Sequence, residues 1–334
     1  MNGAVMTETK YAVVIVTYNR KQLLRECIRQ VTNQTAPAAD IIIVNNASTD
    51  GTRTYLDELG KQDKIYDIIN LPQNIGGAGG FAVGIEHAAT KEVECILIID
   101  DDAMLSKNYM ELLLLARSLK PQYKAFAGIV KVNGKIDLFH RRSISKAGMM
   151  FKKYGEEKYH SSYFECEMAS FCGMLLDVSV VEKIGLPHSY YFICHDDAEY
   201  SLRVSKYSKF LVVTDAILDH KTKLDNGVHP RRYDWKDYYS IRNRILLVNE
   251  HGTIIDKMFT IVDILIHVCL RNWLFMLIKR DRYDWKYENA VASKAIRDAY
   301  NMDIRMGDSD GITADIIPQR GQMQGKGAVF SDKR

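Results

Sequence analysis

Four short β-branched runs constrain the fold of this chain more than any other sequence feature. The runs are YAVVIVTY at 11–18, IIIV at 41–44, DIINL at 67–71 and CILIID at 95–100. Helical patterns follow them at 20–34, 50–59, 79–90 and 106–119. Near-continuous apolar runs of this length are typical of strands buried on both faces of a parallel sheet. The alternation predicts an open, doubly wound α/β sheet, with Asn19 capping the first helix and ligands at the carboxyl ends of the strands.

The composition is that of an ordinary globular protein. Of the 334 residues, 47% are hydrophobic and 26% are charged, and the formal net charge is +3. These values exclude a disordered, collagenous or disulfide-stapled chain, and also a strongly basic nucleic-acid-binding protein. The six cysteines form no CxxC pair and have no zinc-ligand spacing, which indicates reduced thiols in a cytoplasmic protein. We expect neither a signal peptide nor a membrane-spanning helix.

Three parts are expected along the chain. Residues 1–230 should form the α/β domain, in which 120–225 shows a mixed pattern of short strands and loops. Residues 231–305 should form a helical region. Residues 306–334 are polar, contain five glycines and should be a loosely ordered tail.

The most apolar part of the helical region is 256–280. Its polar residues Asp263, His267 and Arg271 recur at every fourth position, so they form one polar stripe on a helix. Basic residues follow it at Lys279, Arg280 and Arg282. The pattern fits either a buried amphipathic helix or an interfacial membrane helix. The exposed face of such a helix would also suit pairing with a second subunit.

Three adjacent carboxylates, Asp100, Asp101 and Asp102, end the buried run CILIID. They repel one another unless a cation lies among them. Because side chains alternate along an extended chain, Asp100 and Asp102 should lie on one side and Asp101 on the other. Two carboxylates on one side suit a hard divalent cation that also binds diphosphate oxygens. The alternative is a solvated acidic turn in which Asp102 caps the next helix.

A glycine-rich loop, NIGGAGGF at 74–81, follows another predicted strand and begins a helix. Glycines there let backbone N–H groups approach an anion at the helix N-terminus. Residues 77–82 also satisfy the GxGxxG/A pattern of dinucleotide-binding proteins. That fingerprint belongs in the first strand-to-helix turn, which is 17–20 in this chain. In addition, one acidic residue is enough to bind the ribose of a dinucleotide, whereas this chain has three adjacent acids. A nicotinamide oxidoreductase is therefore disfavoured.

A second acidic cluster, HDDAE at 195–199, follows three aromatic residues. A carboxylate beside aromatic surface is partly desolvated and becomes a better base near neutral pH. Arg203 stands four residues after Glu199 and could be its helical ion-pair partner. His220 closes a further predicted strand, and a lone histidine is more often structural unless other ligands accompany it.

Together these residues resemble the inverting, metal-dependent family 2 glycosyltransferases of the GT-A fold. The resemblance covers about 11–250. Its motifs are VIVTYNR at 14–20, IIIVNNASTDGT at 41–52, NIGGAGGF at 74–81, IDDDA at 99–103, FCGMLL at 171–176 and HDDAEYSLR at 195–203, and the run YYSIRNRILL at 238–247 is common after the catalytic domain. The resemblance implies a GT-A catalytic domain, with a Rossmann-like open sheet, followed by a C-terminal helical extension.

Within that family the glycine loop, the acid triplet and the later acidic cluster look most like bacterial galactofuranosyltransferases. Those enzymes transfer galactofuranose from UDP-galactofuranose to a hydroxyl of a growing cell-surface glycan. Rhamnosyltransferases that use dTDP-L-rhamnose share the framework and are the close alternative; a catalytically inactive glycan- or nucleotide-binding relative is another. One departure is Asn45-Asn46, where many members carry Asp-Asn. An amide there can still hydrogen-bond uracil.

The resemblance also implies roles for individual residues. Asp100, Asp102 and His220 would hold Mn²⁺ or Mg²⁺ against the donor diphosphate, and Asp197 would be the general base that activates the acceptor hydroxyl. The nucleotide-sugar-binding residues would be Thr17, Asn19, Arg20, Asn46, Asp50, Asn74, Gly76, Gly77 and Asp101. The acceptor-binding residues would be Phe171, Cys172, Gly173, Asp196 and Glu199, of which the last two orient the acceptor or support Asp197.

The expected partners follow from this resemblance. They are a nucleotide-sugar donor, UDP-galactofuranose, and a glycan acceptor. The basic, apolar C-terminal segment favours an acceptor that is linked to a lipid. Nucleic acid is not expected. Residues 256–282 would suit peripheral contact with the inner face of the cell membrane, or homo-oligomer formation.

Overall fold

The computed structural model describes residues 9–145, 148–222, 235–270, 273 and 285–301. Its first half alternates strands and helices, as the apolar runs predict. The elements are β1 (Tyr11–Thr17), α1 (Lys21–Thr32), β2 (Asp40–Asn45), α2 (Thr52–Gln62), β3 (Tyr66–Asn70), α3 (Gly76–Ala89), β4 (Cys95–Asp100), β5 (Ala103–Leu105) and α4 (Tyr109–Leu119). Strands β3, β2, β1 and β4 are parallel neighbours in that order, so the predicted doubly wound arrangement is confirmed.

The predicted cap of the first helix is wrong. Helix α1 begins at Lys21, and its N-cap position is Arg20. Asn19 has a left-handed backbone, with a φ of 53°, and its side-chain oxygen accepts a hydrogen bond from the Thr49 N–H at 2.7 Å. Asn19 thus joins the loops after β1 and β2 because both loops leave the same edge of the sheet.

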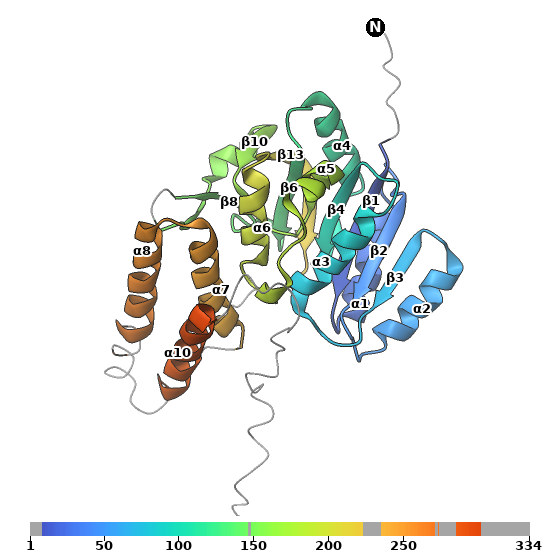
Figure 1. Cartoon of the computed structure of the whole chain (residues 1–334). Coiled ribbons are helices and arrows are strands. Elements are labelled where there is room, and N and C mark those ends of the chain that lie inside the picture. Colours follow the sequence, from blue (N-terminus) through green and yellow to red (C-terminus); the bar gives the residue numbers. More distant parts are fainter. Residues whose placement is uncertain (1–8, 146–147, 223–234, 271–272, 274–284, 302–334) are drawn as a thin grey trace, which may run out of the picture.

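The second half of the α/β part extends the same sheet with shorter elements. These are β6 (Ala125–Val132), β7 (Lys135–Ile136), β8 (Arg141–Ile144), β9 (Phe151–Lys153), η1 (Glu156–His160), β10 (Tyr163–Cys166), β11 (Met168–Ala169), β12 (Met174–Asp177), α5 (Val178–Ile184), η2 (Ser189–Tyr191), α6 (Asp196–Ser205) and β13 (Phe210–His220). In the described part of the chain the main sheet has the order β10-β13-β6-β12-β4-β1-β2-β3, and β11, β8 and β9 form a small second sheet (Figure 1). Strand β12 runs antiparallel between β4 and β6, so β6 and β13 point the same way as β4.

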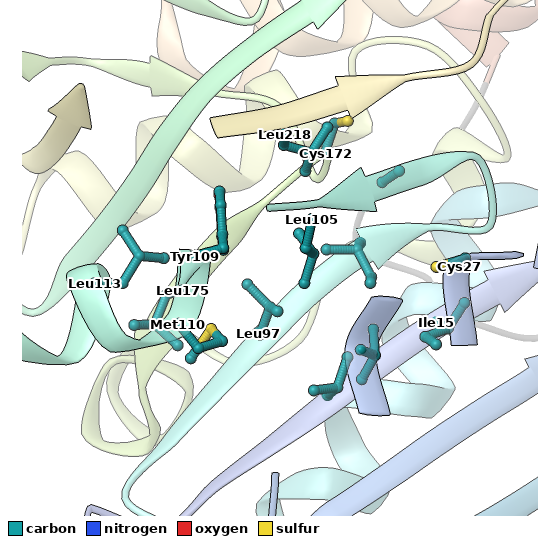
Figure 2. Packing of buried hydrophobic residues seen from close by; sticks show 14 of the residues in the cluster. Ile15, Cys27, Leu97, Leu105, Tyr109, Met110, Leu113, Cys172, Leu175 and Leu218 are labelled. Atoms are coloured by element: carbon teal, nitrogen blue, oxygen red, sulfur yellow. The ribbon is translucent and has the colours of Figure 1, made fainter. Parts of the chain in front are cut away.

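The core has two layers, one on each face of the main sheet. Val13 and Ile15 of β1 pack with α1, α2 and α4, whereas Val14 and Val16 pack with α3, α5 and α6. Figure 2 shows the first layer, where Leu97 of β4 lies among side chains of the neighbouring elements. Each fully buried aliphatic side chain contributes about 1.5–3 kcal/mol, so the sheet holds the strand ends in a fixed arrangement.

In the described part of the chain beyond 234, three α-helices stand to one side of the sheet (Figure 1). They are α7 (Trp235–His251), α8 (Ile254–Leu265), which continues into the π-helix η3 (Ile266–Leu270), and α10 (Trp285–Asn301). Ile245 of α7 belongs to an apolar cluster that contains Ile264 of α8, Ala292 of α10 and Ala78 of α3, so α7 connects the helices to the sheet. The predicted boundary at 230 and the predicted tail, 306–334, lie outside the described residues.

The apolar segment from 256 is helical, but the expectation of a buried helix is wrong for α8. Ile254, Ile255 and Met258 are 76%, 65% and 64% exposed, because only one narrow side of α8 packs on α7. Within the polar stripe, Asp263 pairs with Arg244 of α7 at 2.7 Å. No helix among the described residues has the length and apolar character needed to cross a membrane.

Candidate active site

The side chains singled out by the sequence gather at one edge of the main sheet. Strands β1, β4 and β13 run in the same direction and end there at Thr17, Asp100 and His220. Strand β5 folds back from the acid triplet and pairs with the end of β13, which sets Ala103 opposite His220. Residues more than one hundred positions apart in sequence therefore meet at this edge.

Arg20 and His220 contact the acid triplet. The Arg20 guanidinium lies 3.2 Å from a carboxylate oxygen of Asp101 and 2.6 Å from one of Asp102. The other oxygen of Asp101 accepts a hydrogen bond from the Thr17 hydroxyl at 2.6 Å. His220 Nε2 lies 3.0 Å from the second oxygen of Asp102. Asp101 and Asp102 are thus buried and paired, and the triplet is followed by β5, not by a helix that Asp102 could cap.

The three carboxyl groups have different protonation properties. Desolvation, reinforced by the charge of Asp102, raises the pKa of the half-buried Asp100 to about 7. Burial likewise raises the pKa of Asp101 to about 6, although Thr17 and Arg20 oppose it. Burial would also raise the pKa of Asp102, but the hydrogen bond and charge of His220, together with the charge of Arg20, outweigh it and leave that pKa below its usual value.

The donor set at this edge fits a divalent cation. Ligand atoms of Asp100, Cys172 and His220 all lie within 4.8 Å of one another. Nδ1 of His220 is buried and has no hydrogen-bond partner in the described part of the chain. A carboxylate and an imidazole are ordinary ligands of first-row divalent metals, and a thiol favours the softer ones. The sequence predicted Cys172 only as an acceptor-binding residue. The structure also brings its sulfur close to the carboxylate of Asp100 and the imidazole of His220.

A cleft of about 250 Å³ opens beside the acid triplet. Its lining includes seven of the predicted nucleotide-sugar residues, Thr17, Arg20, Asn46, Asn74, Gly76, Gly77 and Asp101. It also includes residues to which the sequence analysis gave no individual role, Val16, Tyr18, Phe81, Phe192, Ile193, Trp235 and Lys236. A larger cleft of about 620 Å³, between α1 and α2, is lined by none of the acidic motifs, so we place the site at the smaller cleft.

Asn19 and Asp50 do not line this cleft. One carboxylate oxygen of Asp50 accepts a hydrogen bond from the Lys21 N–H at 3.0 Å, and the other accepts from the Thr52 N–H at 3.1 Å. Asp50 therefore holds the starts of α1 and α2 together, in the same way that Asn19 joins the two loops. Asn19 stands between Tyr18 and Arg20, which do line the cleft, so its bridge holds that part of the wall in place.

The glycine-rich loop is joined to the loop before α6. Gly76 has a φ of +77°, and a β-carbon on it would lie 2.2 Å from the carbonyl oxygen of Phe192. The Ala78 N–H donates to that same oxygen at 3.0 Å. Asn46 binds the loop from its other side, since its amide donates to the Gly76 carbonyl and accepts from the Ile75 N–H. At Gly76 the glycine is needed for close backbone approach, a reason that the anion-binding prediction did not include.

The loop before α6 has an unusual backbone that α7 holds in place. Cys194 and His195 have positive φ values of 67° and 63°, which side chains other than glycine rarely adopt. The buried amide of Asn243 donates to the carbonyls of Tyr191, Ile193 and Cys194 at 2.7, 2.8 and 2.7 Å. The run YYSIRNRILL thus has a structural role, although nothing in its local pattern indicates this.

The second acidic cluster begins α6. Partial burial raises the pKa of Asp197, while the nearby charge of Arg142 opposes that rise. Burial, followed by the negative charge of Asp197, raises the pKa of Asp196 well above its usual value. Glu199 is fully buried, and both its oxygens accept hydrogen bonds from Arg203 at 2.7 Å. The helical ion pair that the sequence offered for Glu199 is therefore present.

The segment 171–173 lies between the two halves of the site. The Phe171 ring is 4.7 Å from that of Phe81, which lines the cleft, and 5.9 Å from that of Tyr200 on α6. Gly173 has a φ of +85°, and its carbonyl accepts a hydrogen bond from the Tyr109 hydroxyl at 3.0 Å. The segment is thus fixed from both sides.

Curated relatives with similar sequences are glycosyltransferases. Galactofuranosyltransferase GlfT1 of Mycobacterium tuberculosis is 26% identical over 291 residues, which cover 83% of this chain and 91% of the relative. The galactofuranosyltransferase GlfT1 of Mycolicibacterium smegmatis is 24% identical over 295 residues, with 83% and 93% coverage. The sequence is therefore close to GlfT1 along most of both chains.

Solved structures show the same fold. GalNAc-T7 with UDP, GalNAc and Mn²⁺ superposes with a TM-score of 0.61 at 15% identity, over 88% of this chain and 58% of that one. S. aureus TarS 1-349 in complex with UDP-GlcNAc gives 0.52 at 14% identity, with coverage of 87% and 80%. These likenesses show the GT-A fold. The sequence model of the family described as Glycosyl transferase family 2 matches residues 12–185, more than half of the chain, so this protein belongs to glycosyl transferase family 2.

Proposed function

We propose that this glycosyltransferase is a metal-dependent, inverting galactofuranosyltransferase. It transfers galactofuranose from UDP-galactofuranose to a hydroxyl of a growing cell-surface glycan. The observation that carries the proposal is the cluster of Asp100, Cys172 and His220 beside a cleft lined by the NIGGAGGF loop. The similarity to GlfT1 over most of the chain supports the choice of sugar.

The donor would bind in the cleft, with its nucleoside near Thr17 and Asn46. Asp100 and His220 of this cluster, joined by Asp102, would hold Mn²⁺ or Mg²⁺, whose charge would offset that of the departing diphosphate. Arg20, which pairs with Asp101 and Asp102 in this structure, would then be released toward the diphosphate. Asp101 would instead serve the hydroxyls of the sugar.

The acceptor would approach from the side of α6. Asp197 takes the proton of the acceptor hydroxyl, and the oxygen forms a bond to the anomeric carbon as the bond from that carbon to UDP breaks. Attack opposite the leaving group inverts the anomeric configuration. The raised pKa suits Asp197 to this role, which is typically worth about 10²–10⁴-fold in rate. Asp196 and the segment 171–173 would bind the acceptor, and Glu199 would support α6 through Arg203.

The test is thermal stabilisation by UDP and by dTDP, each with Mn²⁺ and with EDTA. A ligand that binds only the folded state raises stability by RT ln(1 + [L]/Kd). We expect a rise in Tm with UDP and Mn²⁺ that dTDP does not produce and EDTA removes. The opposite nucleotide preference would favour a rhamnosyltransferase, and a UDP shift that survives EDTA would contradict metal dependence.

A further inference from the structure

The outward side of α8 and η3 carries an unusually apolar surface. Of the seventeen large apolar side chains that are exposed in the described part of the chain, ten lie between 254 and 273. They are Ile254, Ile255, Met258, Phe259, Ile261, Val262, Leu265, Ile266, Leu270 and Trp273, and we call them the α8 surface. Their exposure adds up to roughly 1,000 Å², whereas the largest apolar patch of a typical monomer covers about 300–600 Å².

The orientation of α8 is fixed by polar contacts at its inner side. Thr253 and Asp256 form a capping box at its start, and the other oxygen of Asp256 accepts a hydrogen bond from the Gly148 N–H at 2.7 Å. The ion pair of Asp263 with Arg244 secures the middle of the helix against α7. The apolar side therefore faces outward in a well-anchored helix, at the end of the molecule away from β3 (Figure 1).

The charges beside the α8 surface are positive. Lys257 lies on α8 itself, and the exposed Lys152 lies on the β8–β9 hairpin, which reaches α8 through Gly148. Neither lysine makes an ion pair within the described part of the chain. The two acids of α8 itself are already engaged, since Asp256 caps the helix and Asp263 pairs with an arginine. Lys257 thus places a cationic group within the apolar helix, and the adjoining hairpin carries a second one, Lys152.

We propose that the α8 surface binds the surface of an anionic lipid bilayer. Its apolar side chains would enter the boundary between headgroups and acyl chains, and the lysines would lie against the anionic headgroups. A symmetric contact with a second copy fits less well, because it brings the same lysines from both copies together while both acids of α8 are already engaged. The lipid surface satisfies both the apolar and the charged groups.

The α8 surface continues toward the acceptor side of the site. Phe259 packs against Gly148 of the hairpin, and the ring of Phe151 in the same hairpin lies 6.2 Å from that of His195, two residues before Asp197. If the proposed function holds, on which this step rests, a bilayer at the α8 surface would present a lipid-linked glycan to the general base. The acceptor class that we infer is therefore a lipid-linked glycan.

Flotation of the full chain with vesicles tests the proposal. One set of vesicles contains phosphatidylcholine alone, and the other contains equal parts of phosphatidylcholine and phosphatidylglycerol. The test variant is Met258→Glu with Val262→Glu, two positions that are 64% and 53% exposed. The matched control is Leu119→Glu on α4, which is 60% exposed but far from the α8 surface. Tm values and UDP–Mn²⁺ stabilisation verify that each variant is folded.

We expect the wild type and Leu119→Glu to float with the anionic vesicles at low salt, and much less with high salt or neutral vesicles. The double variant should float at least tenfold less while it keeps the UDP–Mn²⁺ shift. Wild type that stays unbound, or a double variant that floats equally well, overturns the proposal. The proposal is also overturned if the wild type is a dimer, the double variant is a monomer, and neither protein floats. If the wild type floats but UDP with Mn²⁺ does not raise its Tm, the result counts against the proposed function alone.

Discussion

Replacing Asn243 by alanine should weaken both the fold and the reaction. In the wild type its buried amide donates to three carbonyls of the loop before α6. The Tyr191 carbonyl keeps a bond from Arg242, whereas the Ile193 carbonyl loses its bond from Asn243, and Cys194 loses one of its contacts. At about 1–3 kcal/mol for a carbonyl left without its hydrogen bond, the free energy of unfolding should fall by about 1–3 kcal/mol.

The functional effect follows from the place of this loop. It contributes Phe192 and Ile193 to the cleft and leads directly into Asp197. Without Asn243 the positive φ values lose their support, so the loop should relax and the transfer rate should fall more than tenfold.

Urea unfolding and transfer kinetics measure the two effects. Asn249→Ala, on the same helix and without a described hydrogen bond, is the matched control and should change stability by less than about 0.5 kcal/mol. If Asn243→Ala costs no more than this control and transfers sugar normally, the loop is not held by Asn243 and our reasoning fails.

Three further predictions concern the base and the glycine loop. Asp197→Asn should lower kcat about 10²–10⁴-fold while Mn²⁺-dependent UDP stabilisation stays unchanged; loss of both would remove the base assignment. Because the base must be deprotonated and its pKa is raised, activity should decline as pH falls through a pKa above the usual carboxyl range; Arg142→Met should move that decline to higher pH in kcat/KM profiles, and an unmoved profile would contradict the charge effect. Gly76→Ala should cost about 3 kcal/mol in urea unfolding, from backbone strain and the clash with Phe192. Gly134→Ala, with a φ of +76° and open space around it, should cost only about 1–2 kcal/mol, and equal costs would argue against the clash.

The strands could be predicted from the sequence because their signal is local. The runs that contain Ile15, Ile43 and Ile98 are apolar over consecutive residues, and only a sheet covered on both faces buries such runs. The carboxyl ends of parallel strands then bring Asp100 and Thr17 to one edge without further information.

Long-range contacts could not be predicted in the same way. Asn243 binds a loop about fifty residues earlier, and the need for Gly76 arises from Phe192, so neighbouring residues carry no sign of either contact. Cys172 reaches the carboxylates only because β12 runs antiparallel beside β4. Asn19 has the residue type of a helix cap, but its positive φ makes it a bridge between two loops.

The apolar character of α8 was visible in the sequence, whereas its direction was not. Periodicity shows that one side of a helix is apolar, but it cannot tell whether protein, lipid or water faces that side. The packing of Ile264 on α7 and the exposure of Met258 decide this.

The most direct test of the central claim is metal-dependent transfer from UDP-galactofuranose to a lipid-linked glycan, followed by NMR of the product's anomeric carbon. We predict release of UDP with Mn²⁺, inversion at the anomeric carbon, and loss of transfer with EDTA or in Asp197→Asn. Transfer from dTDP-L-rhamnose instead, retention of configuration, or full activity in EDTA would contradict the account.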